Sequence, residues 1–110
     1  MSCWKYCFVF SLLLAGAGCT KTGAPSSELV ARGRIVYQAN CIACHHTDPK
    51  RAGTLGPEIF GSSLELLETR VLSAEYPSGY APKRQTHQMV PIPQLKADLP
   101  ALQAFLNAKD

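Results

Sequence analysis

The first element that the apolar pattern predicts is a helix beginning at Glu28. From there, small and apolar side chains and one amide recur three and four residues apart, at Leu29, Gly33, Val36, Tyr37 and Asn40. Residues with this spacing share one face of an α-helix. Ser26 and Ser27 stand directly before it, where a serine hydroxyl can accept a backbone N–H and cap the helix. The predicted helix runs into a pair of cysteines at its C-terminal end.

The second predicted helix covers about Ser63 to Ser73. Its apolar face consists of Leu64, Leu67, Val71 and Leu72. Ser62 and Glu65 match the S-x-x-E pattern of a capping box, in which each side chain accepts the backbone N–H of the other residue. We therefore expect Ser62 to cap this helix.

The last predicted helix follows Asp98, whose carboxylate is expected to cap it. Pro100 falls in its first turn, where the missing N–H of a proline is tolerated. Its apolar face consists of Leu99, Leu102, Phe105 and Leu106.

The segment from Tyr76 to Gln94 is predicted to be irregular. It contains Pro77, Gly79, Pro82, Pro91 and Pro93. This density of prolines excludes a regular helix or a central strand, and a loop this long in a small domain is usually functional. No alternating apolar pattern of useful length occurs in the chain. The sequence therefore predicts an all-α fold.

Residues 1–18 have the pattern of a secretory signal peptide. Lys5 gives a positive start, and the apolar stretch that follows is shorter than the about 20 residues that span a bilayer. Small residues then precede Cys19, which resembles the lipobox of bacterial lipoproteins. The lipobox prefers a large aliphatic residue where this chain has Gly16. We expect lipidation of Cys19, with ordinary cleavage and a soluble periplasmic product as the alternative.

The composition allows one small domain. The chain has 110 residues, a formal net charge of +3 and 46% hydrophobic residues, which suffices for a single limited core. Residues 19–27 are expected to form a lipid-anchored flexible tether to a domain at 28–110, on the periplasmic side of a bacterial membrane. Basic and acidic residues are interspersed. Nucleic-acid binding, which needs a clustered basic face, is not expected.

The cysteine pair and the histidine after it indicate the chemistry of the chain. Residues 41–45 have the sequence Cys-Ile-Ala-Cys-His. Two thiols at this spacing can form thioethers with the two vinyl groups of haem, and the adjacent histidine can bind the iron. A thioredoxin-type pair would need a βαβ pattern, and a zinc site would need a second pair of ligands; the sequence has neither. A disulfide between Cys41 and Cys44 would close a very short loop. We therefore predict one covalent haem c, with His45 as an iron ligand.

From about residue 28 to residue 108, the sequence resembles the class I c-type cytochromes. The motifs that carry the resemblance occur in order: Gly33, Tyr37, the C-x-x-C-H signature at 41–45, Gly56-Pro57, Met89 with a proline close behind, and Phe105. The resemblance implies a small cytochrome c fold, all-α, with helices packed around one covalently bound haem. It also implies that Gly33 and Tyr37 of the first helix cross Phe105 of the last, and that the Pro57 carbonyl accepts the N–H of His45.

The resemblance makes Met89 the leading candidate for the second axial ligand of the iron. It is the only methionine after Met1, and a thioether ligand raises the reduction potential by stabilising ferrous iron. The family commonly has proline directly after this methionine, whereas Val90 here precedes Pro91. His87 is also a competent ligand, two residues away. Bis-histidine ligation, with a lower potential, therefore stays open.

The propionates of a bound haem need hydrogen-bond donors. Tyr76, Tyr80, Lys83 and Arg84 lie in the loop that is expected to line that edge of the haem. Of these we favour Tyr80 and Arg84.

These features predict a monomeric one-electron carrier rather than an enzyme. Iron with both axial positions filled has no place for a substrate, and the protein then supplies a pocket, fixed ligands and an exposed haem edge. The expected partners are a redox protein that donates the electron and another that accepts it. The alternatives are a haem subunit of a larger respiratory complex, or a ligand-binding or peroxidatic haem protein with an open distal site.

Overall fold

The computed structural model describes residues 25–85 and 87–109, and it is helical. Its elements are α1 (Ser27–Asn40), α2 (Leu64–Ser73), the 3₁₀ helix η1 (Pro93–Asp98) and α3 (Leu99–Leu106). The described residues contain no strand, so the predicted all-α fold is confirmed. None of the described helices is long and apolar enough to cross a membrane. The predicted signal peptide, Cys19 and most of the tether lie outside the described residues, and they stay predictions.

Helix α1 begins one residue earlier than the sequence predicts. Ser26 is its N-cap, with its hydroxyl accepting the N–H of Leu29 at 3.2 Å, and Ser27 is already helical. At the other end, Cys41 occupies the C-cap position, and its N–H donates to the carbonyl of Tyr37 at 2.9 Å. The helix therefore ends at the first cysteine, as the apolar pattern indicates.

Helix α2 lies where it is predicted, but the predicted capping box is wrong. Ser63, not Ser62, is the N-cap, and its hydroxyl accepts the N–H of Leu66 at 3.1 Å. Ser62 is buried and turns back into the preceding chain, where its hydroxyl donates to the Ile59 carbonyl at 2.6 Å. Either of the two adjacent serines could have been the N-cap of α2. Because Ser62 is buried, Ser63 is the N-cap.

The start of the last helix also differs from the prediction. Pro93 and Gln94, predicted to be irregular, begin η1, which continues directly into α3. Asp98 at this junction has φ −95° and ψ −7°, not the extended backbone usual for an N-cap, and its side chain makes no capping bond. Its carboxylate instead accepts hydrogen bonds from Arg32 of α1, at 3.0 Å from Nε and 2.5 Å from Nη2.

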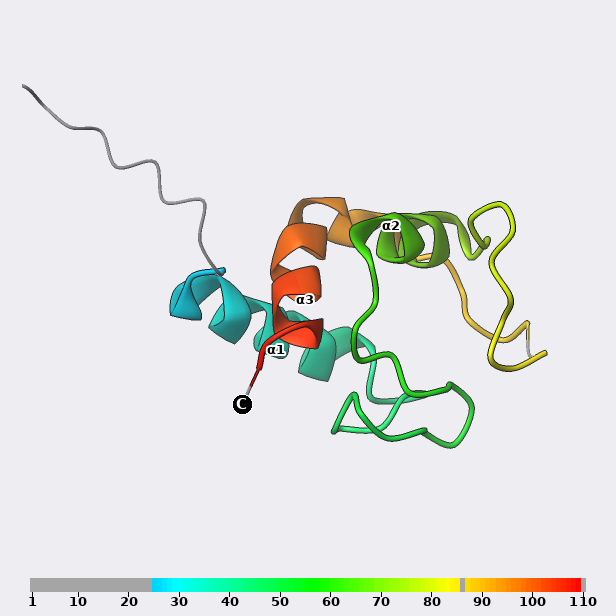
Figure 1. Cartoon of the computed structure of the whole chain (residues 1–110), viewed down its shortest axis with the longest axis horizontal. Helices are drawn as coiled ribbons and strands as arrows, with labels where there is room; N and C mark the ends of the chain where they lie inside the picture. The colour runs from blue at the N-terminus through cyan, green and yellow to red at the C-terminus, as the bar shows by residue number, and fades with distance from the viewer. Residues whose placement is uncertain (1–24, 86, 110) are drawn as a thin grey trace, which may run out of the picture.

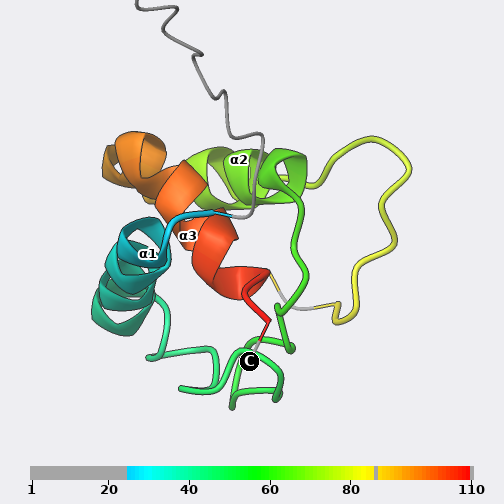
Figure 2. The same ribbon diagram turned by 60° about the vertical axis from the view of Figure 1, so that its left-hand side comes forward.

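Helices α1 and α3 cross in close contact at Gly33 (Figures 1 and 2). A Cβ atom at this position would overlap the carbonyl oxygen of Ala101 and lie 2.8 Å from the Cβ of Phe105. One turn later, the rings of Tyr37 and Phe105 meet at 5.4 Å between centroids and 48° between planes. The crossing implied by the resemblance is therefore present, with the glycine allowing the contact. The core below it consists of Val36, Tyr37, Leu67, Val71, Leu95, Leu99, Leu102 and Leu106.

Tyr37 also ties α1 to the chain that follows the cysteine pair. Its ring is fully buried, and its hydroxyl donates to the His46 carbonyl at 2.5 Å. Burial raises the pKa of Tyr37 to about 12, with smaller contributions from Cys41 and Asp48. Tyr37 thus fills part of the core and, through its hydroxyl, also binds the backbone of the residue next to His45.

We predict that Gly33→Ala destabilises the fold by about 1–3 kcal/mol, because the new methyl group overpacks the α1–α3 crossing. At a solvent-exposed helical position the same change would stabilise, since alanine is the better helix former. Urea unfolding of the two proteins measures the difference. Ala31→Val adds bulk to an exposed position of α1 and is expected to change stability by less than about 0.5 kcal/mol. A Gly33→Ala protein as stable as the wild type would contradict the close crossing.

We predict an alkaline loss of stability that depends on Tyr37. Between pH 10 and about 12 the folded protein keeps the phenol proton that the unfolded chain has lost, because the pKa of Tyr37 is raised from 10.0 to about 12. The contribution of the Tyr37 phenol to stability is therefore fully present below pH 10, and it is lost as the pH rises through the pKa of Tyr37 in the folded protein. Tyr37→Phe should lower the free energy of unfolding by about 1 kcal/mol at pH 8, because the hydrogen bond of the hydroxyl is lost. Above pH 10, the free energy of unfolding of this variant should fall less steeply than that of the wild type.

Urea unfolding at several values of pH between 8 and 12 measures how the free energy of unfolding depends on pH in the wild type and in Tyr37→Phe. Phe105→Leu serves as the control, because it removes part of the same aromatic contact and leaves the phenol in place. It should lower stability and keep the alkaline slope of the wild type. Equal slopes in wild type and Tyr37→Phe would show that another group causes the alkaline loss.

Candidate functional site

The two thiols and the imidazole of the C-x-x-C-H sequence lie in one turn that continues α1. The N–H groups of Cys44 and His45 both donate to the Cys41 carbonyl, at 3.2 and 2.9 Å. Both cysteines are unbonded and partly buried, and they line the same cavity as His45. Burial raises the pKa of the Cys41 thiol to about 11, and the charge of Cys44 adds to the shift. Cys41 is therefore a protonated thiol at neutral pH.

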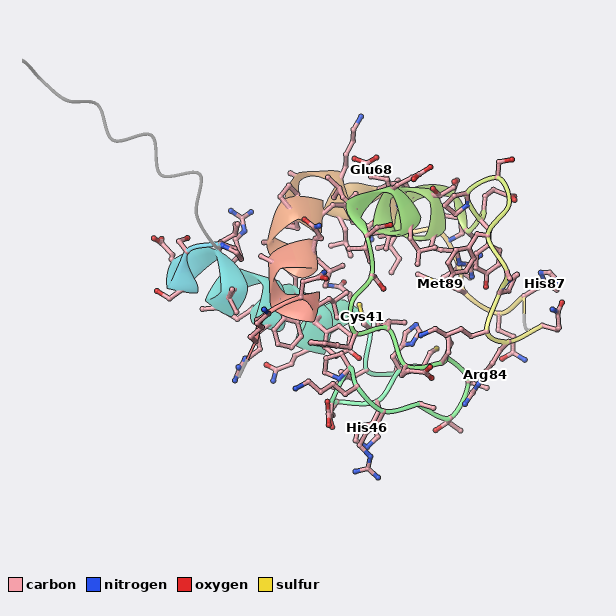
Figure 3. All side chains as sticks on the ribbon, viewed as in Figure 1. Cys41, His46, Glu68, Arg84, His87 and Met89 are labelled. Atoms are coloured by element: carbon pink, nitrogen blue, oxygen red, sulfur yellow. The ribbon has the colours of Figure 1, made fainter. Side chains whose placement is uncertain are left out.

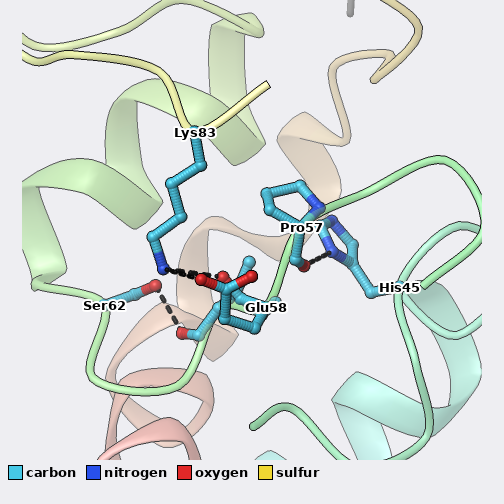
Figure 4. A network of polar contacts seen from close by, with 6 residues as sticks. His45, Pro57, Glu58, Ser62 and Lys83 are labelled. Atoms are coloured by element: carbon cyan, nitrogen blue, oxygen red, sulfur yellow. Dashed lines mark hydrogen bonds and ion pairs between the residues drawn. The ribbon is translucent and has the colours of Figure 1, made fainter. Parts of the chain in front are cut away.

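The imidazole of His45 is oriented by the chain that returns beneath it. Its Nδ1 lies 2.9 Å from the carbonyl oxygen of Pro57, the pairing that the family resemblance implies (Figure 4). With the Nδ1–H donating to this carbonyl, Nε2 keeps its lone pair for a metal ion. The arrangement fixes both the tautomer and the direction of the ring.

Two glycines bring the returning chain close to His45. A Cβ atom on Gly56 would lie 2.5 Å from the imidazole Nδ1, and one on Gly53 would lie 2.6 Å from the backbone carbon of His45. The N–H of Gly56 donates to the Cys44 carbonyl at 3.0 Å, and the N–H of Gly53 donates to the Gly56 carbonyl at 2.9 Å. The contact of Gly53 with His45 could not be predicted from the sequence, because no local pattern reveals which backbone a glycine will touch.

The cavity that these groups line is mainly apolar, and it lies between α2, α3 and the loops at 53–59 and 76–92. Its apolar lining includes Leu55, Ile59, Leu66, Leu67, Val71, Val90, Ile92, Leu95 and Leu102. The thiols and the imidazole are thus gathered against a low-dielectric surface, which suits a large apolar ligand.

Met89 and His87, the two candidate axial ligands, lie in different surroundings. Met89 is half-buried, lines the cavity and packs against the core cluster. His87 is exposed, lies at the outer side of the loop in Figure 3, and is not among the described residues that line the cavity. Of the two candidates, Met89 is therefore the one on the cavity side of this loop.

The predicted propionate donors all line the cavity. Tyr76 and Tyr80 are stacked, with ring centroids 5.3 Å apart and planes 8° from parallel. Arg70 of α2 places its guanidinium 4.1 Å above the Tyr76 ring, and it too lines the cavity. Sequence reasoning missed Arg70, although its position four residues after Leu66 puts it on a lining face of α2.

Lys83 and Arg84 also line the cavity, and both contact the loop at 53–58. Lys83 Nζ lies 3.1 Å from a carboxylate oxygen of Glu58 and donates to the Glu58 carbonyl at 2.9 Å (Figure 4). Arg84 Nη1 donates to the carbonyls of Gly53 and Thr54, at 3.3 and 3.4 Å. A hydrogen bond from the Glu58 backbone, followed by the contact with Lys83, lowers the pKa of the Glu58 carboxyl.

The donor set of the cavity fits a haem. Two free thiols and one oriented imidazole lie in a single turn, and Met89 lines the same apolar cavity together with cationic and phenolic residues. A group of three or more His, Cys, Asp and Glu side chains that could hold a metal ion does not occur among residues 25–85 and 87–109.

Comparison with known proteins adds one relative. No family model matches the chain. Over 68 residues, which are 62% of this chain, the sequence is 35% identical to a protein of Synechocystis sp. described as cytochrome c-553-like. The matched region covers 60% of that protein, so the chain spans less than two thirds of its length. The all-helical arrangement is that of a small cytochrome c, and together with this similarity it supports the c-type cytochrome family for this chain.

Proposed function

We propose that the chain is a mono-haem c-type cytochrome that carries one electron at a time. Cys41 and Cys44 would hold the haem through two thioethers, and His45 and Met89 would be the axial ligands of its iron. The observation that carries the proposal is the single turn after α1, which brings two free thiols and an oriented imidazole to one apolar cavity. The similarity to a cytochrome c-553-like protein supports it independently.

When bound, the haem supplies the reversible change between ferric and ferrous iron, and the residues set the conditions for that change. The hydrogen bond from His45 to Pro57 keeps the imidazole in one orientation and raises its basicity as a ligand. A thioether from Met89 favours the ferrous form. The apolar lining would limit the access of water to the haem, and little rearrangement would then accompany electron transfer.

The choice of Met89 over His87 rests on the sides of the loop that the two residues occupy. Met89 lines the cavity and packs against the core, whereas His87 is exposed. Arg84 and Tyr80 remain our candidates for contacts with the haem propionates, since both line the cavity edge.

The proposed working place is the periplasmic side of a bacterial membrane, with Cys19 lipidated. This part of the proposal rests on the signal-like residues 1–18 and on the small residues before Cys19. Its partners there would be redox proteins that donate and accept the electron. A haem attached outside the cytoplasm agrees with an exported chain.

We predict that Met89→Ala keeps its covalent haem but loses the methionine ligand. The weak far-red band of sulfur bound to ferric iron should disappear, imidazole should bind, and the reduction potential should fall on the order of 0.1 V, because axial ligands control the potential. A redox titration with optical spectra measures all three. His87→Ala, the matched control two residues away, should keep the band and the potential of the wild type.

The control also separates the alternatives. Loss of the low-spin spectrum in His87→Ala, with Met89→Ala unchanged, would establish bis-histidine ligation instead. A wild-type protein that is high-spin in the resting ferric state would establish an open distal site and refute the electron-carrier proposal.

We predict that Cys41→Ser combined with Cys44→Ser leaves little haem protein, since both covalent attachments are lost and the small core then lacks the group it packs around. Haem staining after denaturing electrophoresis measures the attachment, and circular dichroism measures the helix content. Cys19→Ser is the matched cysteine control, and it should keep full haem staining while the protein moves from the membrane fraction to the soluble fraction. Normal staining of the double variant would refute attachment at this pair.

A further inference from the structure

Two loops that face the cavity are joined directly at its edge. The loop at 53–58 carries Pro57, which orients His45, and the loop at 76–92 carries Met89. Lys83 of the second loop contacts Glu58 of the first twice, through the carboxylate at 3.1 Å and through the backbone carbonyl at 2.9 Å (Figure 4). The partner of Lys83 is therefore the residue next to Pro57.

Arg84 makes a second connection between the same loops. Its Nη1 donates to the carbonyls of Gly53 and Thr54, at 3.3 and 3.4 Å. Lys83 and Arg84 are adjacent in sequence, and they hold opposite ends of the 53–58 loop. A pair of contacts with this spacing restrains both the position and the rotation of the chain that carries them.

The 53–58 loop is a firm base for these contacts. Its Gly53 and Gly56 lie against the backbone and ring of His45, and its N–H groups at residues 53, 55 and 56 are all hydrogen-bonded. Pro57 accepts from the His45 ring on the same stretch. Close packing leaves such a segment little room to shift. Because Lys83 and Arg84 bind to this loop, the segment that carries them is fixed in position relative to His45.

The backbone of the segment that carries Met89 has few other hydrogen bonds. Among the described residues after Arg84, the next backbone hydrogen bond to another element is from the N–H of Ile92 to the Val71 carbonyl, at 2.6 Å. Met89 lies five residues after Arg84 and three before Ile92. Among the described residues between those two anchors, no backbone hydrogen bond ties the chain to α1, α2 or α3. Apart from the packing of the Met89 side chain against the core, the position of Met89 thus depends on the two ends of this span.

We propose that Lys83 and Arg84 are positioning residues, which hold the Met89 segment across the cavity and control how readily Met89 leaves the iron. The inference rests on the proposed function, since it requires Met89 to be a ligand. It assigns the two cations a task within the molecule in addition to any contact with the haem propionates.

The size of the effect follows from the exposure of the contacts. The side chains of Lys83 and Glu58 are 44% and 45% exposed, and ion pairs this open to water are individually weak. We expect Lys83→Met to raise the apparent affinity of the ferric protein for imidazole about two- to fivefold. Lys83→Met combined with Arg84→Met should raise it about tenfold, since both connections are lost.

The experiment uses the ferric holoprotein and imidazole as the probe, because imidazole occupies the iron only when the methionine leaves it. The apparent affinity is measured optically at low and high salt. In the wild type, salt should raise the affinity by screening the Lys83–Glu58 pair, and Lys83→Met should lack this dependence. Lys83→Arg should restore most of the wild-type behaviour, because it keeps the charge.

Arg32→Met is the matched control. It also removes one positive charge and one ion pair, but that pair joins α1 to Asp98, away from the cavity. It should leave imidazole binding unchanged. An equal gain in imidazole affinity for Arg32→Met would show that general destabilisation causes the effect, and it would overturn the inference.

Two further outcomes separate this inference from the proposed function. If the wild type has the far-red methionine band, and the double variant binds imidazole like the wild type, the positioning role is refuted and the electron-carrier proposal stands. If the wild type lacks the band, Met89 is not a ligand, and both proposals fall together.

Discussion

The direction of α1 is fixed where Gly33 touches the backbone of α3, and the geometry of the site follows from that contact. Helix α1 ends at Cys41, so the angle at which it crosses α3 decides where the thiols point. The Tyr37–Phe105 contact sets the rotation of α1 about its own axis, since it fixes a second point one turn further on. The Tyr37 hydroxyl then holds the His46 carbonyl. The packing of α1 on α3, together with the Tyr37 hydroxyl bond, thereby orients the turn that carries the cysteines and His45.

The side of the cavity next to His45 is built from backbone and packing. The imidazole lies between its own turn and the returning 53–57 chain, with Gly56 allowing the approach and Pro57 accepting the Nδ1–H. A buried donor without a partner would cost about 1–3 kcal/mol, which favours the ring orientation that satisfies this bond. The orientation of the His45 imidazole is therefore set by the protein chain itself.

The sequence allowed prediction of the elements whose signals are local. Apolar spacing located α1, α2 and α3, and the order of the cysteines and His45 indicated the cofactor. The pairing of His45 with Pro57 came from the family resemblance, because no periodicity relates two residues in a turn and a loop. Burial selected Ser63 over Ser62 as the cap of α2, and burial is a property of the folded chain.

The remaining differences have the same cause. The carboxylate of Asp98 meets Arg32 rather than the N-terminus of α3, across 66 positions of sequence. Lys83 and Glu58 meet across 25 positions, from two loops that lack any repeating pattern. Such contacts exist only after the helices have packed, so a local pattern could not reveal them.

The two sides of the cavity are held by different kinds of force. Steric contact at Gly53 and Gly56 and a backbone acceptor at Pro57 fix the His45 side, and salt has little influence on either. Charged side chains in water fix the start of the Met89 segment, where screening within about 10 Å at 0.1 M salt weakens them. In the proposed cytochrome, such an arrangement would keep His45 constant under changing conditions while Met89 responded to its ionic surroundings. The difference arises from where the glycines and the lysine stand in the chain, because the fold brings both sets of contacts to the same short loop.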